Sequence, residues 1–232
     1  MQLISHRGDW WPIEGAQNHP SSVTSARAHN WSIEIDVWGT HENRLKIGHD
    51  TPDYEWTVPA DEVPQKDTLL FLHMKIPQKD NLWRVHRICE ILQAVGWLEQ
   101  TYLFWSPDHI GPQKEIADFG VKQLLTIDCR EALCAALDHP DSLSLVSGFW
   151  LEQPEKDWIE EADIKAIHDC KKTAWVVGPE LHGRAFDLAS LSAWQTADGL
   201  CTDTPHLLEK LLDREDSIVH PTEAWWQRRE VQ

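Results

Sequence analysis

The chain has 232 residues, of which 41% are hydrophobic and 25% are charged, and its formal net charge is -17. This composition is typical of a soluble, globular protein, and the length suits one α/β barrel of roughly 250 residues. The acidic charge argues against broad binding to nucleic acid or to anionic membranes, since both require a basic surface.

The apolar runs and the cysteines indicate the compartment. No apolar run reaches the ~18 residues that span a bilayer, and the N-terminus MQLISHRGDW lacks the charged and apolar regions of a signal peptide. We therefore expect no stable membrane insertion and a cytoplasmic location. Five scattered cysteines without a C-x-x-C pair are typical of reduced thiols.

Short β-rich runs alternate with helix-like stretches along the whole chain. In chain order, strands are expected at residues 3–6, 33–38, 69–74, 102–105, 121–127, 146–151, 173–177 and 199–202. Eight such repeats predict a parallel sheet closed into a (β/α)8 TIM barrel over residues 1–213, followed by a polar tail at 214–232. An open, doubly wound sheet is the alternative, but the glycine-rich fingerprint that it often carries after its first strand is absent.

Three helices are delimited by the sequence. Residues 81–96 place apolar side chains at helical spacing, and Gly96 offers a natural end. Residues 130–137 are rich in alanine and leucine, and residues 204–213 begin with Thr204-Pro205, a favoured cap and first turn.

Ionisable residues gather where the expected strands end, which is where such barrels have their active sites. In chain order they are His6, Glu34, Asp36, His73, Lys75, Glu152, Glu180 and Asp203. This clustering indicates a catalytic or binding site at the carboxyl ends of the strands.

Glu34 and Asp36 are two residues apart in one expected strand, so their side chains face the same side. Two buried carboxylates would repel each other and need a cation to remain ionised. Oxygen ligands of this kind favour Mg²⁺ or Ca²⁺. An exposed edge strand with two solvated acids is the alternative interpretation.

Two histidines are candidates for proton transfer. His6 is followed by Arg7 and Gly8, which supply a phosphate-binding guanidinium and a flexible turn. His49 follows a short apolar run, next to Asp50. A structural histidine at position 6 and a loop histidine capped by its neighbour at position 49 are the alternatives.

The order of the motifs is more specific than any one of them. They are SHRG at 5–8, QNHP at 17–20, IEIDVW at 33–38, IGHDTP at 47–52, HMK at 73–75 and ADGLCTDTP at 197–205. Together they resemble the glycerophosphodiester phosphodiesterase family, which has a phospholipase C-like TIM barrel. The resemblance runs from residue 2 to about residue 213 and indicates a divergent, short branch.

The resemblance implies an activity and roles for the matching residues. The activity is metal-dependent hydrolysis of a small phosphodiester of lipid metabolism, by water or through a cyclic phosphate. The implied roles are an acid/base pair of His6 and His49, metal ligands Glu34 and Asp36, and phosphate-binding Arg7 and Lys75.

The sequence departs from the family pattern at two places. Residues 16–19 read AQNH where the family has Pro-Glu-Asn-Thr, and His73 stands where the third metal ligand is acidic. His73 could bind a softer ion such as Mn²⁺ or Zn²⁺. Alternatively, Glu152 or Glu180 supplies the third ligand, or two side chains and water suffice. Glu152 and Glu180 are also candidates for substrate binding.

Other functions remain open on the same barrel. A phospholipase D-like enzyme for lipid head groups would need an apolar rim, for which Trp10, Trp11 and Trp56 are candidates. Because His73 stands where the family has an acidic metal ligand, a non-catalytic binding protein is a second alternative. A metal-dependent sugar isomerase or aldolase would use acids after later strands. The oligomeric state does not follow from the sequence.

Overall fold

A computed structural model describes residues 1–10, 13, 15–59, 68–76, 82–106, 114–186 and 188–212. The expected tail at 214–232 lies outside these residues, so its prediction stays open. The five cysteines lie within the described residues and are free thiols.

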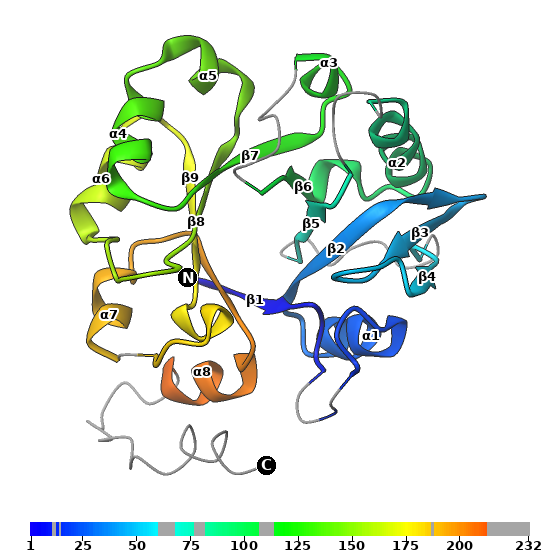
Figure 1. Ribbon diagram of the computed structural model, residues 1–232, viewed down its shortest axis with the longest axis horizontal. Helices are drawn as coiled ribbons and strands as arrows, with labels where there is room; N and C mark the ends of the chain where they lie inside the picture. Colours follow the sequence, from blue (N-terminus) through cyan, green and yellow to red (C-terminus); the bar gives the residue numbers. More distant parts are fainter. Residues whose placement is uncertain are drawn as a thin grey trace.

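The centre of the molecule is a closed barrel of parallel strands (Figure 1). In the described residues its eight strands are β1 (Gln2–His6), β2 (Ser32–His41), β5 (Leu70–Met74), β6 (Thr101–Phe104), β7 (Lys122–Ile127), β8 (Gly148–Leu151), β9 (Thr173–Val177) and β10 (Gly199–Thr202). Each pairs with the next in this order, and β1 pairs with both β2 and β10. The predicted TIM barrel is confirmed, and the open sheet is excluded.

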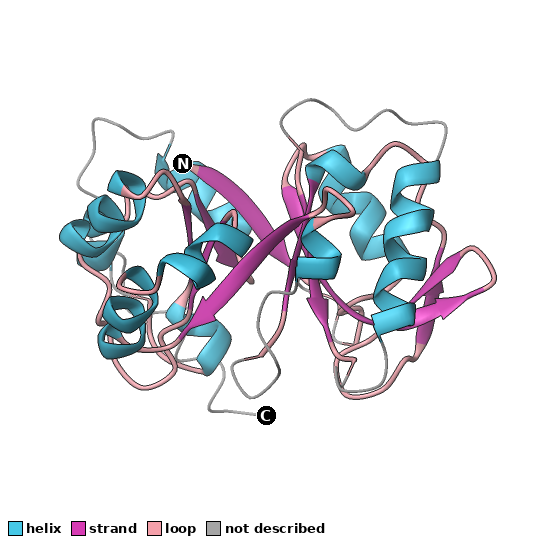
Figure 2. Cartoon of the chain, turned by 90° about the horizontal axis from the view of Figure 1, so that it is seen from above, coloured by secondary structure: helices cyan, strands magenta, loops and turns pink. Residues whose placement is uncertain are grey.

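Helices cover the outside of the barrel (Figure 2). They are α1 (Pro20–Ala28), α2 (Leu82–Ala94), α3 (Lys114–Ala117), α4 (Arg130–Leu137), α5 (Pro140–Leu145), α6 (Glu161–Asp169), α7 (Leu188–Ala193) and α8 (Pro205–Leu212), with short 3-10 turns at Leu98–Gln100 and Pro179–His182. Local sequence fixes several starts: His19 Nδ1 accepts the Ser21 N–H at the start of α1, and Glu160 and Asp163 form a capping box for α6. The helix expected at 130–137 is confirmed, and those expected at 81–96 and 204–213 are confirmed as α2 and α8 within the described residues.

A hairpin that was not predicted from the sequence extends β2 beyond the barrel. β3 (Arg44–Ile47) pairs antiparallel with β2, and β4 (Tyr54–Trp56) pairs antiparallel with β3. Apolar and charged residues alternate in the sequence of β3, and the structure buries Leu45 and Ile47 while their neighbours are half-buried. The run is only four residues long, however, which is too short to distinguish a strand from a loop by alternation alone.

The hydrophobic core has one inner cluster and two outer clusters. The inner one fills the barrel with mainly aromatic side chains, including Phe71, Tyr102, Phe104, Trp150 and Trp175. One outer cluster packs β2 to β6 against α1, α2 and α3, and the other packs β7 to β10 against α4, α6, α7 and α8. Leu3 of β1 contacts both outer clusters, which therefore divide the barrel wall into two halves.

Neither Trp10 nor Trp56 forms the exposed apolar rim that the phospholipase D-like alternative would need. Trp10 is 7% exposed and donates its indole N–H to the His6 carbonyl, and Trp56 is 4% exposed within an outer cluster. Both side chains are buried, so neither supports that alternative. Trp11 lies outside the described residues. Among the described helices, none has the length and apolar character that crossing a bilayer requires.

Gly48 is essential to the turn that carries His49. Its φ is 150° and its N–H donates to the Asp36 carbonyl at 3.2 Å, while a Cβ there would overlap the Thr51 carbonyl oxygen. We expect Gly48→Ala to lower the free energy of unfolding by roughly 1–3 kcal/mol more than Gly96→Ala, as overpacking does. Gly96 is the matched control, because its φ is 78° but a Cβ added there would meet no heavy atom within 4 Å. Urea denaturation measures both, and equal losses would contradict the expectation.

Candidate active site

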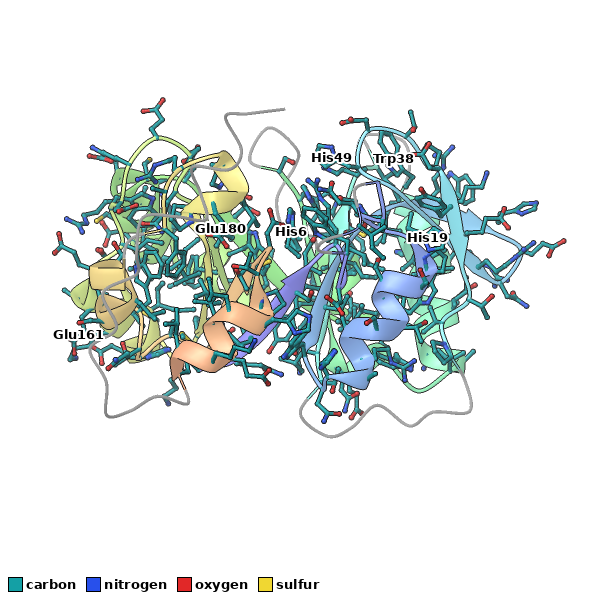
Figure 3. All side chains as sticks on the ribbon, turned by 90° about the horizontal axis from the view of Figure 1, so that it is seen from below. His6, His19, Trp38, His49, Glu161 and Glu180 are labelled. Atoms are coloured by element: carbon teal, nitrogen blue, oxygen red, sulfur yellow. The ribbon has the colours of Figure 1, made fainter. Side chains whose placement is uncertain are left out.

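The barrel strands place polar side chains in one layer directly above the aromatic core. Because side chains alternate along a strand, the residue two positions after a core residue also points inward. Four strands follow this pattern, in the pairs Ile4 and His6, Phe71 and His73, Trp150 and Glu152, and Cys201 and Asp203. Figure 3 shows His6 near the middle of the molecule, with Glu180 and His49 on either side of it.

Glu34 and Asp36 lie inside the barrel, on one face of β2. They are 2% and 1% exposed, whereas Ile33, Ile35 and Val37 on the other face pack in an outer cluster. The interpretation of this segment as an exposed edge strand is therefore wrong. The site has to stabilise two adjacent carboxylates away from water.

Asp36 is surrounded by cationic and polar side chains. Its Oδ1 lies 3.0 Å from His73 Nδ1 and 3.1 Å from Lys75 Nζ, and its Oδ2 lies 3.1 Å from Arg7 Nε. Burial alone would raise the pKa of Asp36, but His73, Lys75 and Arg7 together hold it well below its usual value. Asp36 is therefore ionised, and the two predicted phosphate-binding cations both contact it.

Asn18 fixes the orientation of Asp36. The Asn18 amide donates to Asp36 Oδ2 at 2.9 Å and accepts the Asp36 backbone N–H at 3.0 Å. Asn18 is fully buried, with a φ of 57°, in the loop before α1. It belongs to the QNHP motif at 17–20, but no role for it was predicted from the sequence.

Glu34 has fewer stabilising contacts than Asp36. The Arg7 backbone N–H donates to its Oε2 at 3.2 Å, and His6 Nε2 lies 3.9 Å from the same oxygen. Burial, and next the charge of Asp36, raise the pKa of Glu34 well above its ordinary value. A divalent cation between the two carboxylates would remove this penalty.

Glu34, Asp36 and His73 form a group that could hold a metal ion. One ligand atom from each of these residues lies within 4.8 Å of the others. Asp36 Oδ1 is buried and, within the described part of the chain, forms no hydrogen bond of ordinary geometry. His73 Nε2 lies 2.9 Å from the Ser106 hydroxyl, which leaves Nδ1 facing Asp36. Of the possible third ligands, the geometry favours His73, and neither Glu152 nor Glu180 belongs to this group.

His6 is oriented by a chain of acidic contacts. Its Nδ1 lies 2.7 Å from Asp203 Oδ1, and its Nε2 faces Glu34. The carboxylate of Glu180 accepts the Thr202 hydroxyl at 2.6 Å and the Asp203 backbone N–H at 3.4 Å. These contacts favour a supporting position for Glu180 behind Asp203 rather than direct contact with a substrate. From the sequence, Asp203 was one of the acids after later strands that kept an isomerase or aldolase open. Its contact with His6 was not predicted, because only the closed barrel brings the two residues together.

His49 comes from the end of β3, outside the barrel wall. Its Nδ1 lies 2.7 Å from Asp50 Oδ1, as the alternative interpretation expected, and Trp38 anchors the preceding turn by donating to the Gly48 carbonyl at 2.7 Å. Burial lowers the pKa of His49, and Arg7 lowers it further. His49 therefore lies within the electrostatic field of the site and is neutral near pH 7.

Glu152 and Glu180 are carboxyl groups with raised pKa values. Burial raises the pKa of Glu152 to about 7, with a further contribution from Asp128. Burial also raises the pKa of Glu180 to about 7, although the Thr202 hydroxyl opposes the shift. Either group can therefore exchange a proton near neutral pH.

Comparison with known proteins supports the fold. No family model and no curated protein matches the sequence. Among solved structures, a glycerophosphodiester phosphodiesterase from Parabacteroides distasonis is 16% identical, with a TM-score of 0.57 over 91% of this chain and 96% of that one. A protein from Galdieria sulphuraria, provisionally assigned the same activity, is 14% identical, with a TM-score of 0.66 over 91% and 97%. A glycerophosphodiester phosphodiesterase from Agrobacterium tumefaciens is also 14% identical, with a TM-score of 0.55 over 92% and 99%. The chain therefore has the fold of these proteins.

The raised pKa of Glu152 should affect stability as a function of pH. The folded protein holds the Glu152 proton up to about pH 7, while the unfolded chain releases it near pH 4.5, so stability falls as the pH rises through this window. Between pH 5 and 8 we expect the wild type to lose roughly 2.5 kcal/mol more than Glu152→Gln, whose side chain does not titrate. Urea denaturation across this range measures the difference. Glu161→Gln, at an exposed position far from the site (Figure 3), should retain the wild-type slope, and a wild-type slope in Glu152→Gln would contradict the assignment.

Proposed function

We propose that the chain is a metal-dependent phosphodiesterase that hydrolyses small, glycerophosphodiester-type substrates. The observation behind this proposal is the buried Asp36 carboxylate, which contacts an imidazole, an ammonium and a guanidinium at 3.0 to 3.1 Å. Such a group of charges suits an ion and a phosphate bound together. The proteins that share the fold, named for the same reaction, make this substrate class the first to test.

Arg7 and Lys75 would bind the phosphate. Both lie at the carboxyl end of the barrel, and their charges complement the phosphate oxygens. Glu34, Asp36 and His73 would hold the divalent ion. When bound, that ion would neutralise charge that develops on the phosphoryl oxygens.

His49 and His6 would divide the proton transfers. His49 has a lowered pKa, so it is neutral and can accept a proton from the attacking water or substrate hydroxyl. Asp203, which lies 2.7 Å from His6 Nδ1, would orient the ring so that Nε2 can donate a proton to the leaving alcohol oxygen.

The alternatives receive less support from the geometry. An enzyme that engages lipid head groups through a tryptophan rim is disfavoured, because Trp10 and Trp56 are buried. An isomerase or aldolase with ligands spread over later strands is disfavoured, because this metal-capable group comes from β2 and β5. A non-catalytic binding barrel remains a possible outcome of the assay.

The first test is release of alcohol from glycerophosphodiesters and from an aryl phosphodiester. We expect activity that requires a divalent metal and is abolished by a chelator. His6→Ala should lower kcat by about 100- to 10,000-fold, the range for a lost general acid. The matched control is His168→Ala. His168 lies on α6, and its Nε2 is 3.0 Å from Asp198 Oδ2. This variant should retain full activity. An absence of turnover with Mg²⁺, Ca²⁺, Mn²⁺ and Zn²⁺ would favour the binding protein.

A second test concerns the third metal ligand. An imidazole ligand favours Mn²⁺ or Zn²⁺, whereas an all-carboxylate set favours Mg²⁺ or Ca²⁺. His73→Glu should therefore raise the activity ratio of Mg²⁺ to Mn²⁺ by about 10-fold or more, on the scale of a ligand change. Ser106→Ala removes only the hydroxyl beside His73 Nε2 and should leave that ratio close to the wild-type value. An unchanged ratio in His73→Glu would exclude His73 as a ligand.

A further inference from the structure

Outside the candidate active site, two histidines and an aspartate converge from three separate segments. Asp9 lies in the loop after β1, His29 directly follows α1, and His206 lies in the first turn of α8. His206 Nε2 is 3.1 Å from Asp9 Oδ1, and His29 Nε2 is 4.0 Å from Asp9 Oδ2. One ligand atom from each residue lies within 4.8 Å of the others.

The Asp9 carboxylate is held in place before any ligand binds. Its backbone N–H donates to the Ser22 carbonyl at 2.9 Å, and its Oδ2 accepts the Ser25 hydroxyl at 2.6 Å. Its side chain is only 10% exposed. A hydrogen-bonded carboxylate of this kind is typical of preorganised metal ligands.

Trp31 holds the two imidazoles. His29 stacks on the Trp31 ring at a centroid distance of 4.5 Å, and His206 meets the same ring edge-on at 4.4 Å. Trp31 is buried, whereas the His29 and His206 side chains are 44% and 41% exposed. The ring contacts therefore direct both Nε2 atoms toward Asp9 while leaving the group open to ions from solvent.

The distances among Asp9, His29 and His206 fit three ligands around one ion better than three side chains joined directly by hydrogen bonds. The 4.0 Å gap between His29 and Asp9 exceeds hydrogen-bond length. Ligands at ~2.0–2.1 Å from one tetrahedral zinc lie about 3.3 Å apart, so small side-chain movements would bring all three into its coordination sphere. Two imidazoles and a carboxylate favour zinc-class ions over Mg²⁺ or Ca²⁺, and water can complete the set.

We propose that Asp9, His29 and His206 form a second metal site, which takes Zn²⁺ or a similar transition-metal ion. The site would join the first β/α unit of the barrel to the last helix, at the place where α8 packs against β1. It shares no residue with the group formed by Glu34, Asp36 and His73 and does not depend on the proposed activity.

The test counts bound metal in the full-length chain. Equilibrium dialysis against Zn²⁺ should give one equivalent fewer for His29→Gln/His206→Gln than for the wild type. Zinc affinity at this site should fall at least about 100-fold, since even the loss of a supporting residue can cost that much. His168→Gln is the matched control. It alters a partly exposed histidine–aspartate pair that, among the described residues, belongs to neither metal-capable group, so it should retain the wild-type stoichiometry.

Visible absorption of bound Co²⁺ gives an independent readout of imidazole ligation. In a variant with Asp36→Asn and His73→Gln, one Co²⁺ spectrum should remain, and it should disappear when His29 and His206 are also replaced by glutamine. Circular dichroism would verify that each variant is folded. Equal zinc stoichiometry in His29→Gln/His206→Gln and His168→Gln, with the same Co²⁺ spectrum, would overturn the proposal and leave an ordinary ion pair stacked on Trp31.

Discussion

The negative charge of Asp36, held inside the barrel almost without contact to water, is the constraint to which the rest of the site responds. A buried carboxylate of this kind is stable only when cations and hydrogen-bond donors surround it. Several segments provide them: Asn18 from the loop before α1, Arg7 from the end of β1, and His73 and Lys75 from β5 and the residue after it. The segments lie on or after the neighbouring strands β1, β2 and β5, so the strand order of the fold brings the compensating charges to Asp36.

The aromatic interior explains why the polar groups remain at one end of the barrel. Stacked rings such as Phe71, Tyr102, Phe104 and Trp150 fill the space beneath them and exclude water. Charged groups directly above this filling have little access to solvent, and burial is accordingly the first cause of the raised pKa values of Glu34, Glu152 and Glu180. The abundance of tryptophan in the sequence thus contributes to the electrostatics of the site as well as to packing.

Much of the barrel was predictable, because each strand is a short apolar run and side chains alternate along it. The strands at 173–177 and 199–202 and the helix at 130–137 have the predicted bounds. The spacing of two residues was also enough to place Glu34 and Asp36 on one face. The hairpin of β3 and β4 was missed, because four alternating residues resemble a loop. The contact between Asp203 and His6 spans 197 positions and depends on the pairing of β1 with β10, which local patterns do not reveal.

The two halves of the barrel wall, each packed by one outer cluster, also contribute different side chains to the polar layer above the aromatic core. Residues 31 to 75 of the first half supply both carboxylates and His73, whereas the second half supplies Glu180 and Asp203. The halves meet at β1, where Leu3 contacts both clusters, and at β6 and β7, whose pairing covers only Tyr102 with Lys122 and Leu103 with Gln123. Each half resembles a cooperative folding unit, of the kind that can form partly independently during folding. A chain with only one half folded would contain either the ion-binding carboxylates or the acids that orient His6, so a complete active centre would mark the last event of folding, the closure of the barrel.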